Sequence, residues 1–193
     1  MILIAGDSYS DSNHVHKKIE QHYFSWSNEL LHIYYDSICV AASGEGNWDI
    51  KRQLSRYNNY SLAIVSVSYL SRLPIHLGES RKNTLTEKQI THLNLKWARE
   101  ICELPNTYVW TLFPGYETVE KVDFLKDLTA EDGLVWDKTL NTCVTGNHLT
   151  LKGNIWMINH MQKIINQKLT RVHNVNSGLR HYKNYTPNRD IDE

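Results

Sequence analysis

A short apolar run that ends in a glycine turn, at the start of the chain, constrains the fold more than any other feature. Residues 2–5 read Ile-Leu-Ile-Ala, and Gly6, Asp7 and Ser8 follow directly. Four apolar residues bounded by glycine are typical of a buried parallel strand, and glycine lets the backbone turn sharply. Because open α/β sheets bind ligands at the carboxyl ends of their strands, this turn would present the Ser8 hydroxyl as a nucleophile. These residues are also common in turns, so a plain strand-to-helix turn is the alternative.

A histidine near the other end of the chain supplies a partner for this serine. His148 stands just before residues 149–168, whose apolar residues recur with helical spacing. Thr150 is the predicted N-cap of that helix, because its hydroxyl could accept a free backbone N–H of the first turn. A capped helix start would hold His148 in a fixed place.

With these two features the chain resembles the SGNH, or GDSL-type, hydrolases. Their first block is Gly-Asp-Ser near the N-terminus, and their last block places the catalytic histidine ahead of a final helix. The resemblance covers about residues 1–168. It implies a flavodoxin-like, three-layer α/β/α fold with a parallel sheet. It also implies a serine hydrolase that cleaves an ester, with Ser8 as the nucleophile and His148 as the general base.

Two further segments resemble the intermediate blocks of that family. Residues 43–47, Ser-Gly-Glu-Gly-Asn, follow a predicted strand and resemble the second block, where a glycine N–H joins the oxyanion hole. Residues 68–72, Ser-Tyr-Leu-Ser-Arg, stand where the family usually carries Gly-x-Asn-Asp. This second loop is closer to the serine-rich, arginine-ended form in SGNH-like proteins of tailed phages, which suggests a phage origin.

The resemblance implies a set of oxyanion donors and a loop residue that could bind substrate. The backbone N–H groups of Ser8 and Gly44 are the expected donors, and the side chain of Asn47 or Ser68 would replace the missing asparagine. Arg72 could bind a substrate carboxylate or phosphate in a bidentate manner, or it could form a surface ion pair.

The histidine block departs from the family pattern. The family has Asp-x-x-His, in which the aspartate orients the imidazole, whereas Thr145 occupies that position here. Threonine can accept a hydrogen bond from the ring but supplies no charge. A backbone carbonyl or a distant acid such as Asp137 could take this role, or activity could be reduced or lost. The alternative function is therefore a catalytically impaired SGNH-like binding or host-interaction protein.

The rest of the chain alternates between helical and strand patterns. Helices are predicted at 24–35, at 48–57 with Asn47 as a cap, and at 87–104 with Thr86 as a cap, and strands at 37–42, 62–67 and 107–113. In the third helix, Ile90, Leu93, Trp97 and Ile101 are expected on one buried face. This alternation favours a parallel sheet covered by helices on both faces. Residues 1–169 would form one domain, and 170–193 a surface-wrapping or disordered extension.

Composition and charge limit the partners of this domain. The chain has 193 residues with 21 basic and 21 acidic side chains, so its zero net charge argues against binding nucleic acid by phosphate neutralisation. The sequence contains no apparent membrane span or signal peptide, which favours the cytoplasm, or the host cytoplasm for a phage protein. A small ester or an acetylated carbohydrate is the expected substrate, and the oligomeric state is open.

Neither metals nor cofactors are expected. Cys39, Cys102 and Cys143 are odd in number and widely spaced, which favours reduced thiols over disulfides or a zinc site. His14 and His16 could lie on one face of a strand, but no third ligand stands at a recognisable spacing.

Overall fold

A parallel β-sheet forms the centre of the protein. The computed structural model describes residues 1–12, 25–74, 84–125, 149 and 151–173. Within these residues the sheet has five parallel strands in the order β2-β1-β3-β4-β5. The strands are β1 (Ile2–Ala5), β2 (Ser37–Cys39), β3 (Leu62–Ser66), β4 (Thr107–Thr111) and β5 (Val122–Phe124). This is the strand order of the flavodoxin-like sheet, so the predicted α/β class is confirmed.

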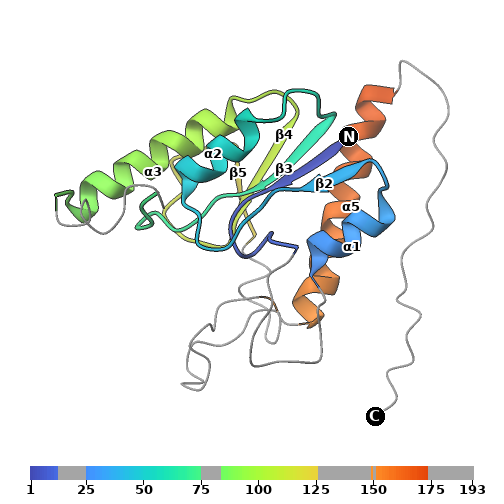
Figure 1. Cartoon of the computed structure of the whole chain (residues 1–193), viewed down its shortest axis with the longest axis horizontal. Helices are drawn as coiled ribbons and strands as arrows, with labels where there is room; N and C mark the ends of the chain where they lie inside the picture. The colour runs from blue at the N-terminus through green and yellow to red at the C-terminus, as the bar shows by residue number, and fades with distance from the viewer. Residues whose placement is uncertain (13–24, 75–83, 126–148, 150, 174–193) are drawn as a thin grey trace, which may run out of the picture.

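Helices cover both faces of this sheet, which gives three layers (Figure 1). Helices α1 (Trp26–Ile33) and α5 (Leu151–His173) pack against each other on one face. Helices α2 (Asn47–Ser55) and α3 (Glu87–Cys102) form a second contacting pair on the opposite face. Because all strands are parallel, the segments that follow β1, β2, β3 and β4 leave the sheet at the same edge.

Two of the three interior strands, β1 and β3, are buried along their whole length. Strands that are covered on both faces read as continuous apolar runs, which explains why these two were visible in the sequence. From the helices, Trp26 of α1 packs edge-on against Trp110 of β4 with ring centroids 5.9 Å apart, and Met157 and Met161 of α5 are fully buried.

Strand β5 was not among the strands predicted from the sequence. It is three residues long, and two of them are exposed. Side chains of neighbouring elements hold this edge strand in place. The Tyr108 hydroxyl of β4 donates a 2.6 Å hydrogen bond to Asp123 of β5 and lies 3.0 Å from Nε2 of His160 in α5.

The predicted buried face of α3 is only partly right. Ile101 is buried as expected, but Leu93 and Trp97 are half-buried, and Asn94 and Ala98 point into the core instead. Asn94 lies there because its amide nitrogen donates 2.9 Å hydrogen bonds to the carbonyls of two residues in the loop after β3. The polar partner in that loop, rather than the apolar spacing, sets the rotation of the helix.

Helix ends agree with the predictions at one cap and differ at two other points. Thr86 is the N-cap of α3, since its hydroxyl accepts a 3.3 Å bond from the Gln89 N–H. The predicted Asn47 cap of α2 is wrong: Gly46 is the N-cap, and Asn47 is already helical. Helix α5 runs to His173, five residues beyond the expected end at 168. Thr150 lies outside the described residues.

Two further findings concern membranes and thiols. Across the described ranges, no helix has the length and apolar character needed to cross a bilayer. Cys39 and Cys102 are free thiols, and Cys143 lies outside those ranges.

We predict that Trp26 contributes stability through packing and through one hydrogen bond. Its indole N–H donates a 2.7 Å bond to the carbonyl of Tyr9, and the side chain is fully buried. Trp26→Ala should lower the free energy of unfolding by about 3 to 5 kcal/mol. Trp26→Phe should cost about 1 to 3 kcal/mol, because a buried carbonyl loses its donor. Urea denaturation would measure both, with the half-buried Trp156→Phe as a control that should cost less than either. Equal stability of Trp26→Phe and the parent would contradict the role of the hydrogen bond.

Candidate active site

The turn after β1 is fixed by a glycine and by a side chain from α2. Gly6 has φ +148°, and a Cβ at this position would overlap the Ser66 hydroxyl of β3. The Gly6 N–H donates to Gln53 Oε1 at 2.9 Å, and Gln53 Nε2 donates back to the Gly6 carbonyl at 3.1 Å. The end of β1 is therefore held from two sides, and only glycine fits there.

Ser8 lies at the carboxyl end of β1, as predicted. It is half-buried, and within the described ranges its hydroxyl makes no hydrogen bond. The residues after it are firmly held, because the Ser10 N–H donates to the Asp7 carbonyl at 3.0 Å and the Ser10 hydroxyl donates to Ser66 at 2.8 Å. A rigid main chain thus carries a serine hydroxyl that is not committed to another described group.

The predicted partners of Ser8 lie outside the described residues. These are His148, Thr145 and Asp137. Their roles remain predictions.

The loop that contains Gly44 lies next to the serine turn. The Ala42 N–H donates to the Gly6 carbonyl at 3.1 Å. Ser43 donates to the Asp11 carboxylate from its N–H at 3.1 Å and from its hydroxyl at 2.9 Å. Gly44 itself is exposed and has φ +86°, with no atom within 4 Å of a Cβ built on it. Its position is compatible with the predicted role of a backbone donor toward open space.

Asn47 lies in the core and holds the loop after β3. Its side chain accepts the Ser68 N–H at 2.8 Å and donates to the Asn94 carbonyl at 3.2 Å and to the Tyr116 hydroxyl at 2.6 Å. The Tyr116 hydroxyl in turn donates to the Ser68 carbonyl. Asn47 is fully buried, so donation to an oxyanion would require one of these bonds to break. Its role as an oxyanion donor stays a prediction.

Arg72 points toward the serine turn. Its Nη1 atom lies 3.5 Å from Asp7 Oδ2 and donates to the Ser68 hydroxyl at 3.0 Å. It also donates to the Glu45 carbonyl at 3.4 Å, and the guanidinium lies over the Tyr69 ring at 5.3 Å. Of the two predicted roles, the ion pair is present, but its partner is a buried carboxylate rather than a surface acid.

Asp7 is the site residue that the sequence analysis did not single out. Its carboxyl is fully buried, and Oδ1 accepts the Tyr9 N–H at 3.1 Å. Oδ2 has no hydrogen-bond partner, so Arg72 meets it as an ion pair only. Burial raises the pKa of Asp7 above its usual value, while the Tyr9 N–H and the Arg72 charge oppose that rise. A glycine-flanked aspartate reads as a turn residue in sequence, and nothing there signals its burial.

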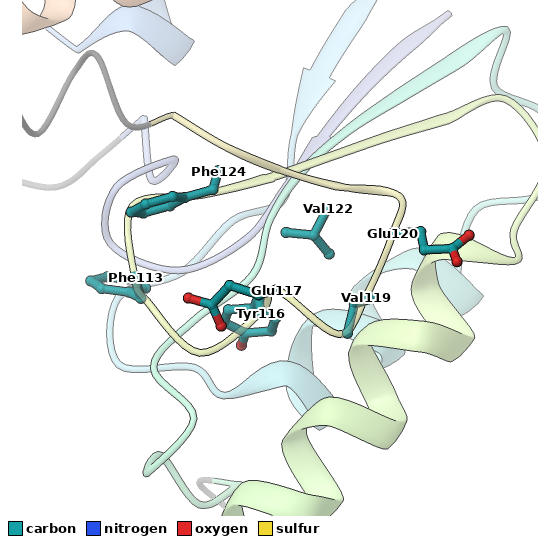
Figure 2. Close-up of a pocket in the computed structure, with 7 residues that line it drawn as sticks. All are labelled: Phe113, Tyr116, Glu117, Val119, Glu120, Val122 and Phe124. Carbon is teal, nitrogen blue, oxygen red and sulfur yellow. The ribbon is translucent and has the colours of Figure 1, made fainter.

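Aromatic side chains form a wall beside the serine turn. The Phe113 ring lies edge-on to Tyr9 at 5.4 Å and 3.7 Å from the Tyr69 ring, centroid to centroid. Figure 2 shows Phe113 at one end of a pocket of about 120 Å³ between the segment after β4 and β5. The other residues that line the same pocket are Tyr116, Glu117, Val119, Glu120, Val122 and Phe124. Phe113 therefore connects this pocket to the residue that follows Ser8.

The described residues contain no group of three side chains able to hold a metal ion. His14 and His16 lie outside them.

Comparisons with known proteins find likeness of structure and none of sequence. No family model matches the chain, and no curated protein matches it. A solved structure of the psychrotrophic esterase EstA from Pseudoalteromonas sp., inhibited by monoethylphosphonate, is similar with a TM-score of 0.48 and 17% identity. The alignment covers 88% of this chain and 98% of that one. The fold assignment above rests on strand order and helix placement alone.

The close packing of Gly6 gives a prediction about stability. Gly6→Ala should lower the free energy of unfolding by about 2 to 5 kcal/mol, because it combines backbone strain with overlap against Ser66. Gly44→Ala is the matched control: it also has a positive φ but open space, and should cost about 1 to 2 kcal/mol. Thermal unfolding of both variants would measure the difference. Equal losses would show that crowding at Gly6 carries no penalty.

The buried carboxyl of Asp7 gives a prediction about pH. Because its pKa is raised in the folded protein, folding favours the protonated form. The associated stability is fully present below about pH 3.9, the usual aspartate pKa, and is lost as pH rises through the folded value. Asp7→Asn removes this titration and keeps the shape. The free energy of unfolding of the parent, relative to Asp7→Asn, should therefore fall as pH rises from 4 to 7 in urea titrations. A parent that instead gains stability over this range would mean that Arg72 outweighs the burial.

Proposed function

We propose that this protein is a serine hydrolase of the SGNH type that cleaves an ester, with Ser8 as nucleophile and His148 as general base. The observation that carries the proposal is the turn after β1. Gly6 in this turn occupies a backbone position that only glycine fits, and Gln53 binds it. Ser8 is half-buried, and its hydroxyl forms no hydrogen bond within the described ranges. Such a turn at the carboxyl edge of a parallel sheet suits an exposed nucleophile.

The reaction would proceed by acyl transfer. Ser8 Oγ attacks the ester carbonyl while the neutral imidazole of His148 takes its proton, and the same ring then protonates the leaving alcohol. Water enters in the second half, gives its proton to the ring and attacks the acyl carbon, and the ring then protonates Ser8 Oγ as its bond to the acyl group breaks and the acid leaves. Thr145, a backbone carbonyl or Asp137 would orient the ring.

The developing negative charge would be met mainly by backbone donors. The N–H groups of Ser8 and Gly44 are the proposed pair, since the serine turn and the Gly44 loop are joined through the bond from the Ala42 N–H to the Gly6 carbonyl. Asn47 would add a side-chain donor only by giving up a present partner, whereas the Ser68 hydroxyl accepts from Arg72 and that bond leaves its own hydrogen free to donate. Each donor of this kind contributes about 2.7 to 4 kcal/mol to transition-state stabilisation.

A small ester or an acetylated carbohydrate is the proposed substrate class. Among the aromatic residues near the serine turn, Tyr69 is half-buried and packs on the buried Phe113, so its exposed part could contact a sugar ring or a short acyl group. The likeness of loop 68–72 to SGNH-like proteins of tailed phages remains a resemblance of sequence.

The second candidate function is a binding protein with an impaired site. The engagement of the Asn47 amide in internal hydrogen bonds favours it, because one side-chain donor fewer faces a substrate. Reaction of Ser8 with a phosphonate would separate the two functions.

We predict that a fluorophosphonate labels Ser8 and that the protein hydrolyses p-nitrophenyl acetate. Ser8→Ala should abolish labelling and lower kcat at least about 10³-fold, because the nucleophile is lost. His148→Ala should have a similar effect, and the parent rate should rise with pH as the imidazole, with an ordinary pKa of about 6.5, becomes neutral. Mass spectrometry locates the label, and Ser55→Ala, exposed at the end of α2, serves as the control. Turnover that persists in Ser8→Ala would refute the assignment, and a folded parent without label or turnover would favour the binding protein.

A further inference from the structure

We infer that Arg72 is a positioning residue that fixes the three loops of the proposed oxyanion hole relative to one another. The inference rests on the proposed function for the role of these loops. The three loops follow β1, β2 and β3, and they carry Ser8, Gly44 and Ser68 respectively.

One nitrogen of Arg72 contacts all three loops. Nη1 lies 3.5 Å from the carboxylate of Asp7, 3.4 Å from the carbonyl of Glu45 and 3.0 Å from the hydroxyl of Ser68. Asp7 precedes the proposed nucleophile, and Glu45 follows Gly44. Each contact therefore falls on a proposed donor residue or on its immediate neighbour.

The guanidinium is held in place before any substrate arrives. The main chain of Arg72 is fixed at both ends, because its N–H donates to the Tyr69 carbonyl at 3.1 Å and its carbonyl accepts from Asn94 at 2.9 Å. The Tyr69 ring supports the charged group from one face. The planar, rigid donor array of arginine suits several partners at once, whereas lysine acts as a flexible point charge.

The two charged partners of the Arg72–Asp7 contact differ in how far they are buried. The Asp7 side chain is 1% exposed and the Arg72 side chain 27%, so the carboxylate has lost its water while the cation retains part of its own. The guanidinium therefore faces the buried Asp7 carboxyl from the more exposed side of the contact. Gln53 joins two of these loops rather than three: it forms hydrogen bonds with Gly6 in the first loop and with Glu45 in the second.

The consequence for catalysis lies in the chemical step. Displacement of reacting groups by about 1 Å can cost on the order of 10²-fold in rate. Loss of Arg72 should therefore slow the reaction of bound ester or phosphonate and leave the affinity for it nearly unchanged. A residue that bound the substrate itself would change affinity instead.

The test compares the variants Arg72→Gln and Arg72→Lys with the control variant Arg52→Gln. In the parent, the Arg52 guanidinium lies over the Trp48 ring on α2, 4.8 Å from its centroid. The first measurement is amide hydrogen exchange of the full-length protein at residues 7–10, 42–46 and 67–70. The second is the saturating rate of Ser8 labelling by a fluorophosphonate, together with its half-saturating concentration. The third is labelling of Arg72→Gln with millimolar guanidinium added.

If the inference is right, Arg72→Gln loses protection in all three segments and labels Ser8 about 10-fold to 100-fold more slowly at saturation. The half-saturating concentration stays within a few fold, added guanidinium restores part of the rate, and Arg52→Gln behaves as the parent. Arg72→Lys should keep the charge beside Asp7 and still label slowly, which tests the inference even if Arg72→Gln fails to fold.

Other outcomes would overturn it. These are loss of protection in one segment only, a full rate in either folded Arg72 variant, or a change confined to the half-saturating concentration. Failure of the proposed function looks different, because the parent itself would then show no label on Ser8. In that case hydrogen exchange alone judges the inference: joint loosening of the three segments supports it, and unchanged protection refutes it.

Discussion

The burial of the Asp7 carboxylate is the constraint on which this edge of the sheet depends. An ionised carboxylate without water costs several kcal/mol unless neighbours supply donors or charge. The Tyr9 N–H satisfies one oxygen, and the guanidinium of Arg72 faces the other. Arg72 reaches this carboxylate from the loop after β3. The side-chain amide of Asn94 in α3 donates a hydrogen bond to the carbonyl of Arg72 in the same loop.

A second set of polar contacts follows from that loop path. Ser68 presents its N–H to Asn47 and its carbonyl to Tyr116, so both main-chain groups are satisfied by side chains. In the family that the chain resembles, an asparagine in this third loop points to the oxyanion. In this protein the side chain of Asn47, at the start of α2, instead accepts a hydrogen bond from the Ser68 N–H of that loop. The Asn47 amide is bonded to the loop backbone and to buried partners, so it holds this loop in place.

The predictions from sequence succeeded where the signal was local. Strand β1 and the Thr86 cap were visible because a bounded apolar run and a capping threonine act over a few neighbours. Strand β5 was missed because three residues with two exposed side chains carry no such pattern. The position of Ser8 followed from β1, but the contacts of Asp7 with Arg72, and of Asn47 with Ser68, join segments far apart in the chain. Apolar spacing contains no information about such polar pairs, and this is also why Asn47 was mistaken for a cap.

The departures from the family pattern can be reconciled with an oxyanion hole. Preorganised donors stabilise a developing charge because they need no reorientation during the reaction, and backbone N–H groups meet that requirement without depending on side-chain identity. In this protein the side chains of Gln53, Asn47 and Arg72 bind main-chain atoms of the three loops. They therefore fix the loop backbones, including those that carry the N–H groups of Ser8 and Gly44. A missing asparagine removes one donor from such a site, whereas the loss of a loop contact would disturb the donors that remain.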